Sequence, residues 1–112
     1  MHEAALTQSL IKVLLTQADR VKANSISRVT VKVGQLKAVE PQSLSFCFEM
    51  FAKDTLIEGA QLVIDHVPAR ATCHGCRRSF DISRFCFRCD ACQSRNIELI
   101  QGEELFIESF ET

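Results

Sequence analysis

The strongest constraint on the fold is a cysteine-rich stretch late in the chain. It contains Cys73-His-Gly-Cys76 and, after a spacer, Cys86-Phe-Arg-Cys89-Asp-Ala-Cys92. Each Cys-x-x-Cys pair can form a tight turn, or knuckle, whose two sulfurs converge on one point, so two pairs supply the four ligands of a tetrahedral thiolate site. The spacing predicts a closed, structural metal site of the zinc-ribbon type. Disulfides or free buried thiols are the alternative interpretation.

Three of these cysteines overlap, because Cys86, Cys89 and Cys92 form two successive Cys-x-x-Cys pairs. Four ligands are needed, so either Cys86 or Cys92 is left over. Cys86 lies between two phenylalanines, which suits a buried apolar thiol or a strand leading into the knuckle. A turn-like Gln-Ser-Arg-Asn run follows Cys92 and suits the exit from a knuckle. We predict zinc ligation by Cys73, Cys76, Cys89 and Cys92, with Cys86 as a small hydrophobic residue.

The size and hydropathy of the chain favour a small folded protein. Its 112 residues suffice for one ordinary domain, or for one small domain plus a metal-stabilised appendage. No apolar run approaches the ~20 residues that span a bilayer. The start, Met1-His2-Glu3, lacks the basic region of a signal peptide, and Lys12 interrupts the first apolar stretch. We expect a cytoplasmic protein without a membrane partner, in which paired cysteines bind metal.

Charge is unevenly distributed along the chain. Residues 70–95 hold six Arg against two Asp, a formal charge of +4, so the remainder carries −5 to give the net −1. A zinc tetrathiolate contributes about −2, which lowers the segment to about +2. This is a modest basic face, and solvated arginines beside the thiolates account for it better than a nucleic-acid stripe does.

Hydrophobic periodicity predicts two helices and three strands. Residues 5–22 and a segment that begins at Pro41 show helical spacing, and Pro favours the first helical position. Residues 26–33, 61–67 and 105–110 alternate as strands do. The predicted apolar faces are Leu6, Leu10, Val13, Leu14 and Val21 in the first helix, and Leu44, Cys47, Phe48 and Phe51 in the second.

These elements predict an α/β fold in which two helices cover one face of a small mixed or antiparallel three-stranded sheet. The cysteine module is then an insertion between two strands. We predict one domain formed by residues 1–69 plus 96–112, and a zinc-binding module at 70–95. The sequence shows no Ser/His/Asp set, phosphate-binding Gly loop or paired carboxylates, so we do not expect an enzyme.

A second notable feature is His2. A His at position 2 can bind a metal through the α-amine, its own amide nitrogen and its imidazole, three nitrogens in one plane. A fourth ligand completes the square-planar geometry that Ni(II) or Cu(II) prefers. Met1 and Glu3 are neighbours that offer further backbone nitrogens, or the Glu3 carboxylate. Because a helix N-terminus repels cations, we expect these residues just ahead of the first helix.

Together these features resemble the HypA/HybF family of nickel-insertion chaperones for NiFe hydrogenase. The resemblance covers nearly the whole chain and includes Met1-His2-Glu3, Gly34-x-Leu36-x-x-Val39-Glu40-Pro41, Leu44-x-Phe46-x-Phe48 and the two late Cys-x-x-Cys pairs. It implies nickel binding by His2 and structural zinc on Cys73, Cys76, Cys89 and Cys92. It thereby makes residues 1–69 plus 96–112 the nickel-binding domain.

The resemblance also implies the partners. The chain would take Ni(II) as cargo, work with a HypB-type GTPase and dock on the hydrogenase large-subunit precursor. Some members of the family also serve urease maturation. We expect a monomer or weak homodimer that carries out no reaction of its own.

Two other functions use the same cysteines. A zinc-ribbon module that binds protein or nucleic acid would use Phe80, Phe85 and Phe87 beside neighbouring arginines, although the net negative charge opposes nucleic acid as partner. A rubredoxin-like iron carrier also needs four thiolates. Salt-dependent titration with single-stranded nucleic acid tests the first function, and colour tests the second.

Overall fold

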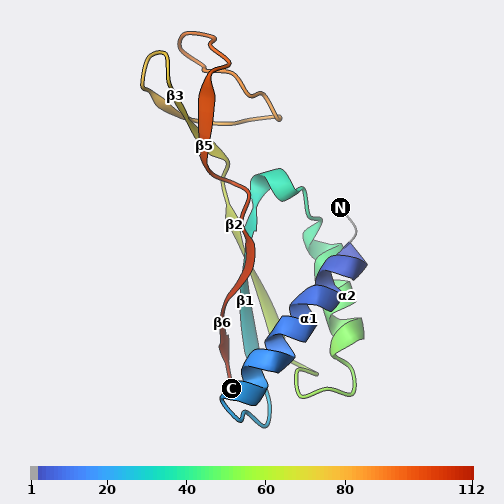
Figure 1. Ribbon diagram of the computed structural model, residues 1–112. Helices are drawn as coiled ribbons and strands as arrows, with labels where there is room; N and C mark the ends of the chain where they lie inside the picture. The colour runs from blue at the N-terminus through green and yellow to red at the C-terminus, as the bar shows by residue number, and fades with distance from the viewer. Residues whose placement is uncertain (1–2) are drawn as a thin grey trace. The chain divides into compact units, whose positions relative to one another are not determined.

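The computed structural model describes residues 3–112. Met1 and His2 lie outside the described residues. The elements, shown in Figure 1, are α1 (Glu3–Arg20), β1 (Arg28–Gly34), the 3-10 turn η1 (Gln35–Lys37), α2 (Pro41–Ala52), β2 (Gln61–Val67), β3 (Arg70–Cys73), β4 (Ser79–Asp81), β5 (Ile97–Gln101) and β6 (Leu105–Glu111).

The chain divides into two compact units. The first comprises residues 3–32, Val39–Asp65 and Phe106–Thr112, and the second comprises Val33–Ala38 and His66–Leu105. The second unit therefore extends beyond the predicted module 70–95 and includes the short segment after β1. Neither helix of residues 3–112 is long and apolar enough to cross a membrane.

The sheet of the first unit has the order β2-β1-β6. The Gln61 N–H donates to the Ser27 carbonyl at 2.9 Å, which joins the beginnings of β1 and β2. Farther along the same strands, Lys32 and Asp65 form an ion pair at 3.0 Å, so β1 and β2 run parallel. The Ser27 N–H donates to Glu111, at the end of β6, so β1 and β6 run antiparallel. The predicted mixed three-stranded sheet is confirmed.

Both helices lie on one side of this sheet (Figure 1), and together they bury the core of the first unit. The central strand supplies β-branched Val29 and Val31, both fully buried, as the alternation of β1 predicts. The other buried hydrophobic residues of this unit are Leu10, Ile11, Leu14, Ala18, Ile26, Leu44, Phe48, Ala52 and Ile57.

Both predicted helix faces are partly wrong. Val13 in α1 is 51% exposed, Val21 just beyond the end of α1 is 62% exposed, and Phe51 in α2 is 39% exposed. Cys47 is only half-buried. The buried stripes instead contain small residues, with Thr7 and Ala18 in α1 and Ala52 in α2 beside the larger apolar side chains. Small side chains let a helix approach closely, so packing in this core follows volume as well as hydrophobicity.

The second unit contains a sheet that periodicity did not predict. Its order is β4-β3-β5, and both pairs are antiparallel. Ala71 lies opposite Phe80 on one side and Leu99 on the other. The buried core is small and consists of Ala69, Ala71, Cys73, Phe80, Ile82 and Cys89.

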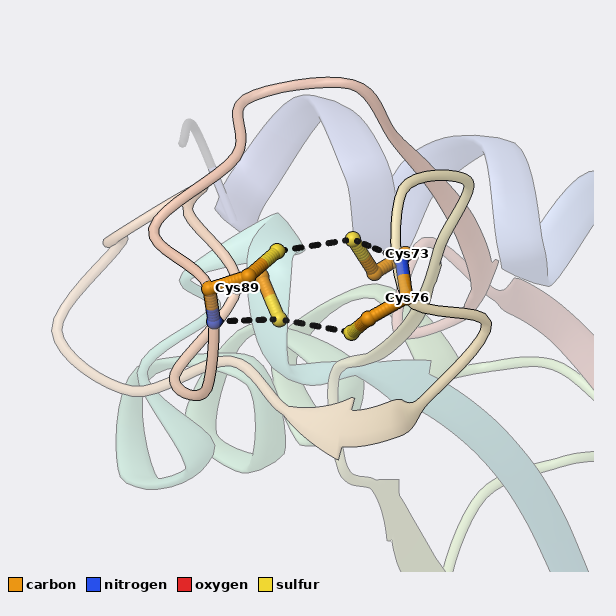
Figure 2. Close-up of side chains that lie close together, drawn as sticks. Cys73, Cys76 and Cys89 are labelled. Atoms are coloured by element: carbon orange, nitrogen blue, oxygen red, sulfur yellow. Dashed lines mark hydrogen bonds between the residues drawn. The ribbon is translucent and has the colours of Figure 1, made fainter.

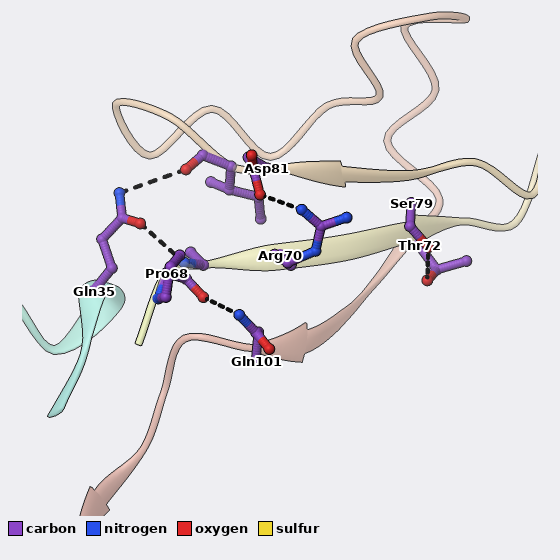
Figure 3. Close-up of polar contacts among 9 residues, drawn as sticks. Gln35, Pro68, Arg70, Thr72, Ser79, Asp81 and Gln101 are labelled. Carbon is purple, nitrogen blue, oxygen red and sulfur yellow. Dashed lines mark hydrogen bonds and ion pairs between the residues drawn. The ribbon is translucent and has the colours of Figure 1, made fainter. Parts of the chain in front are cut away.

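Side chains from η1 and β5 hold the beginning of this second sheet (Figure 3). The side-chain oxygen of Gln35 accepts from the Ala69 N–H at 2.9 Å, and the side-chain amide nitrogen of Gln35 donates to the Ile82 carbonyl at 3.5 Å. Gln101 donates to the Pro68 carbonyl at 2.9 Å, and Arg70 pairs with Asp81 across β3 and β4. These contacts explain why the segment after β1 belongs to the second unit.

Two glycines let the backbones of this unit approach closely. A Cβ on Gly34 would overlap the Gly102 carbonyl, and a Cβ on Gly102 would lie 2.6 Å from the Ala69 Cα. Gly102 also has a φ of 120°, which side chains disfavour. Gly34, the last residue of β1, therefore lies at a close contact between two backbone segments.

Candidate metal centre

The four predicted ligands come together in the second unit, and Figure 2 labels three of them, Cys73, Cys76 and Cys89. The sulfurs of Cys73, Cys76, Cys89 and Cys92 all lie within 4.8 Å of one another. The Cys73 and Cys92 sulfurs are 3.6 Å apart, as are those of Cys76 and Cys89. Zn–S bonds of about 2.3 Å in a tetrahedron place sulfurs about 3.8 Å apart. The four sulfurs therefore fit a tetrahedral metal ion.

Both knuckles have the same local structure. In the first, the N–H groups of Gly75 and Cys76 donate to the Cys73 sulfur at 3.3 and 3.5 Å. In the second, the N–H groups of Ala91 and Cys92 donate to the Cys89 sulfur at 3.4 and 3.5 Å. Each knuckle thus presents two amide protons to its first sulfur, an arrangement that stabilises a thiolate.

The exits from the knuckles match as well. Arg77 and Gln93 lie four residues after the first cysteine of each pair, and both have left-handed backbone, with φ of 63° and 66°. Each donates its N–H to the carbonyl of that cysteine, at 2.8 and 3.0 Å. The repeat marks the pairs beginning at Cys73 and Cys89 as equivalent.

Hydrogen bonding gives the metal-free thiols unequal acidities. Amide protons, chiefly that of Cys76, lower the pKa of Cys73 to about 6. The pKa of Cys89 is also lowered, chiefly by the Cys92 amide. The Arg78 amide lowers the pKa of Cys76, but the neighbouring cysteine sulfurs, chiefly that of Cys89, outweigh it and raise this pKa. The Ser94 amide likewise opposes the neighbouring sulfurs, chiefly that of Cys73, which raise the pKa of Cys92 to about 11. The buried cysteine of each pair is therefore the first to supply the thiolate that a metal needs.

The fifth cysteine of this region is placed differently. Cys86 is exposed, which contradicts its prediction as a buried thiol, and it is not among the four clustered cysteines. Phe85 and Phe87 are also exposed, at 56% and 43%, and their rings make an edge contact with centroids 6.4 Å apart. An Arg78–Asp90 ion pair at 3.1 Å joins the exit of the first knuckle to the second.

The predicted nickel ligand, His2, and its neighbour Met1 lie outside the described residues. Glu3, which we expected just ahead of the first helix, is instead the first residue of α1. Its carboxylate accepts from the Glu40 N–H at 3.0 Å. The Glu40 carboxylate caps α2 by accepting from the Ser43 N–H at 2.6 Å. Sequence reasoning identified the Glu40-Pro41 helix start but missed this link between the two helix beginnings.

Comparison with known proteins identifies relatives over the whole chain. The family model described as "Hydrogenase/urease nickel incorporation, metallochaperone, hypA" matches residues 1–112. The hydrogenase maturation factors HypA of Dehalococcoides mccartyi and Geobacter metallireducens are each 36% identical over 111 residues. These matches cover 99% of this chain, and 93% and 98% of the respective relatives.

Solved structures show the same fold. The solution structure of the Ni metallochaperone HypA from Helicobacter pylori is 29% identical, with a TM-score of 0.71. The match covers 100% of this chain and 97% of that chain. A second solution structure, of a HypA protein, has a TM-score of 0.72 at 29% identity, with coverage of 100% and 96%.

Proposed function

The chain belongs to the HypA family of nickel metallochaperones for hydrogenase maturation, and we propose that it binds Ni(II) at its N-terminus while zinc stabilises its second unit. Members of this family are metallochaperones and not enzymes, so the nickel ion is cargo that is bound and later released without a chemical reaction. The observation that carries the proposal is the separation of two metal-binding chemistries, with a closed cluster of four sulfurs and a nitrogen-rich N-terminus elsewhere in the sequence.

Zinc is the metal we assign to Cys73, Cys76, Cys89 and Cys92. Four sulfurs complete a tetrahedral shell, which leaves no position for exchange or catalysis. The amide protons directed at Cys73 and Cys89 offset part of the thiolate charge, as donors around a zinc–thiolate site do. Zinc bound to these cysteines would cross-link the two knuckles and would catalyse no reaction.

Nickel is the cargo we assign to His2, with the α-amine and the backbone nitrogens of Met1 and Glu3 as neighbouring donors. Nitrogen donors in one plane suit Ni(II), and fewer than four protein ligands favour release. The Glu3 carboxylate accepts from the Glu40 N–H, so the carboxylates of Glu3 and Glu40 both lie at the beginnings of α1 and α2. Their negative charge offsets the positive helix N-termini, which would otherwise repel the cation.

The cargo must pass to other maturation proteins. The family resemblance supports a HypB-type GTPase and the hydrogenase large-subunit precursor as partners, and urease maturation factors as further ones. The cytoplasmic location and the division into a nickel-binding domain, residues 1–69 plus 96–112, and a zinc module at 70–95 are parts of the same proposal.

Nickel titration of the zinc-loaded protein tests the assignment. We expect one nickel per chain in the wild type, no specific nickel binding after His2→Ala or after extension of the chain ahead of Met1, and unchanged zinc content in both. His66→Ala is the matched control, because it removes an exposed imidazole from β2 and should preserve nickel binding. Unchanged nickel affinity in the His2→Ala variant contradicts the proposal.

A further inference from the structure

We propose that the loop of residues 84–88 docks an acidic segment of another protein, one that carries a large apolar side chain between its carboxylates. This surface, which we call the Phe–Arg loop, reads Arg84-Phe85-Cys86-Phe87-Arg88. It lies in the second unit, in the connection from β4 to β5 (Figure 1), and includes none of the four clustered cysteines. The proposal concerns protein docking and does not depend on nickel binding by His2.

The two phenylalanines of this loop contact each other and are exposed to water. Phe85 is 56% exposed and Phe87 is 43% exposed, whereas Phe80, the third phenylalanine of the cysteine-rich region, is buried. The rings of Phe85 and Phe87 make an edge contact, with centroids 6.4 Å apart and planes at 64°. Rings that already hold each other lose less conformational freedom on binding than two separate side chains do. The pair is therefore a preformed apolar anchor, and a partner that covers it removes apolar surface from water.

The arginines on either side of the rings have no carboxylate partner among the described residues. Residues 70–95 contain two aspartates, and both Asp81 and Asp90 already form ion pairs with other arginines. Arg84 and Arg88 are exposed, and neither takes part in an ion pair of the described chain. Even with a zinc tetrathiolate of about −2, the segment retains about +2. Carboxylates of a partner would supply the missing opposite charge.

A strained turn presents two of these side chains. The Cys86 N–H donates to the Ser83 carbonyl at 3.0 Å, and the two residues between them, Arg84 and Phe85, both have left-handed backbone, with φ of 53° and 56°. Gly, Asn and Asp favour this conformation, whereas a bulky residue rarely adopts it. Strained backbone of this kind gathers at binding sites. Because glycine would form the same turn at lower cost, the strain indicates that the side chains of Arg84 and Phe85 serve recognition.

Other exposed phenylalanines have acidic neighbours instead. Phe106, 46% exposed, stands between Glu104 and Glu108 in the sequence. Phe46, 62% exposed, precedes Glu49 by less than one turn of α2. Carboxylates beside these rings would repel an acidic segment. The Phe–Arg loop has a cation on each side of its rings, and this difference selects the loop as the docking surface and sets the sign of the partner's charge.

A protein segment fits this loop better than a nucleic acid does. The two rings meet edge to face, so they do not form the row of ring faces on which successive bases stack. The chain outside residues 70–95 carries −5, which repels a polyphosphate as a whole. An acidic peptide needs only a local pair of cations and an apolar contact between them, and residues 84–88 offer both.

Titration of the zinc-loaded full chain with a synthetic peptide, followed by NMR, tests the charged part of this surface. The probe is acetyl-Asp-Glu-Leu-Phe-Glu-Asp-amide, and we expect saturable amide shifts at residues 84–88 that weaken as salt is added. Arg84→Glu/Arg88→Glu should bind this peptide about tenfold or more weakly. The same variant should bind the matched peptide in which Lys replaces each acidic residue, which also shows that it folds. Lys12→Glu/Lys53→Glu makes the same change in net charge at exposed positions of the first unit and should leave binding of the acidic peptide intact.

The aromatic part of the surface has its own variant. Phe85→Ser/Phe87→Ser should weaken binding of the acidic peptide about tenfold or more, because apolar burial is lost, while zinc content and the amide spectrum outside the loop stay unchanged. Wild type that shows no saturable shifts at residues 84–88 overturns the proposal, as does binding unaffected by either double variant of the loop. A single-stranded oligonucleotide or anionic vesicles that bind the loop more tightly than the peptide does would also overturn it, and would assign the surface to nucleic acid or to a membrane.

Discussion

In the first unit most buried residues come from α1, α2 and β1, whereas two of the six residues in the buried core cluster of the second unit are cysteines of the metal cluster. The first unit buries large side chains such as Leu14, Leu44 and Phe48. The core cluster of the second contains two alanines and two large apolar side chains, Phe80 and Ile82. Apolar burial scales with area removed from water, so the second core contributes far less.

This difference indicates how the chain divides its stability. A core as small as that of the second unit needs a cross-link, which the clustered thiols supply when they bind metal. The first unit needs none, because its helices cover a sheet with a continuous core. Each unit should therefore respond to a perturbation that leaves the other folded.

Metal removal should have the largest effect. Replacing Cys73 by Ser, or stripping the metal with a chelator, should unfold the second unit while the first keeps its helices, because binding free energy at such a site is folding free energy. Amide exchange should show loss of protection at Ala71 and retention at Val31. Cys86→Ser is the matched control and should keep zinc and protection. Amide protection of the second unit that persists without metal would contradict the conclusion that this unit depends on its metal cross-link.

A cavity in the first unit should produce the opposite pattern. Leu44 is fully buried in α2, so Leu44→Ala should lower the free energy of unfolding of this unit by about 2–5 kcal/mol, through lost burial and the cavity left behind. Zinc content should be unchanged. Denaturant unfolding measured by helix signal gives the loss, and Met50→Ala, at a 51% exposed position of α2, should change it little. Loss of zinc from the Leu44 variant would show that the units are not separable.

The smallest effect should come from the helix cap at Glu40. The Ser43 and Gln42 amides hold the pKa of this carboxyl below its ordinary value of 4.5. A lowered pKa in the folded state means that the carboxylate stabilises the fold above about pH 4.5 and that this contribution disappears as pH falls through the lowered pKa. Wild type should therefore lose more Tm than Glu40→Gln between neutral pH and about pH 3. Equal acid-induced losses in the two proteins would rule out this role.

The sequence predicted the first unit better than the second. Strong periodicity placed both helices and the strands at 26–33, 61–67 and 105–110 within a few residues of β1, β2 and β6. The helix faces were less accurate, because Val13 and Phe51 are apolar but the close contacts fall to Ala18 and Ala52. Tertiary packing decides which residues of a helix are buried, and the sequence of one helix alone does not hold that information.

In the second unit, spacing identified the cysteine cluster but not its scaffold. β3 and β4 have four and three residues, too few for a visible alternation, and cross-strand pairing defines them. The contribution of Gln35 was also hidden, since it acts on Ala69, which is 34 positions away. The flanking Phe85 and Phe87 suggested that Cys86 is a buried thiol, whereas the structure exposes it.

The interleaving of the two units has a consequence for the order in which a growing chain can complete them. The second unit needs no residue after Leu105, and its four clustered cysteines have all been synthesised at Cys92. The first unit needs β6, since Ser27 bonds to Glu111 across 84 positions. During synthesis the metal-binding unit can therefore close first, while β1, made much earlier, still waits for its antiparallel neighbour. Early metal capture would shorten the loop that β1 and β6 must close, at the moment when the unpaired strand is most exposed to aggregation.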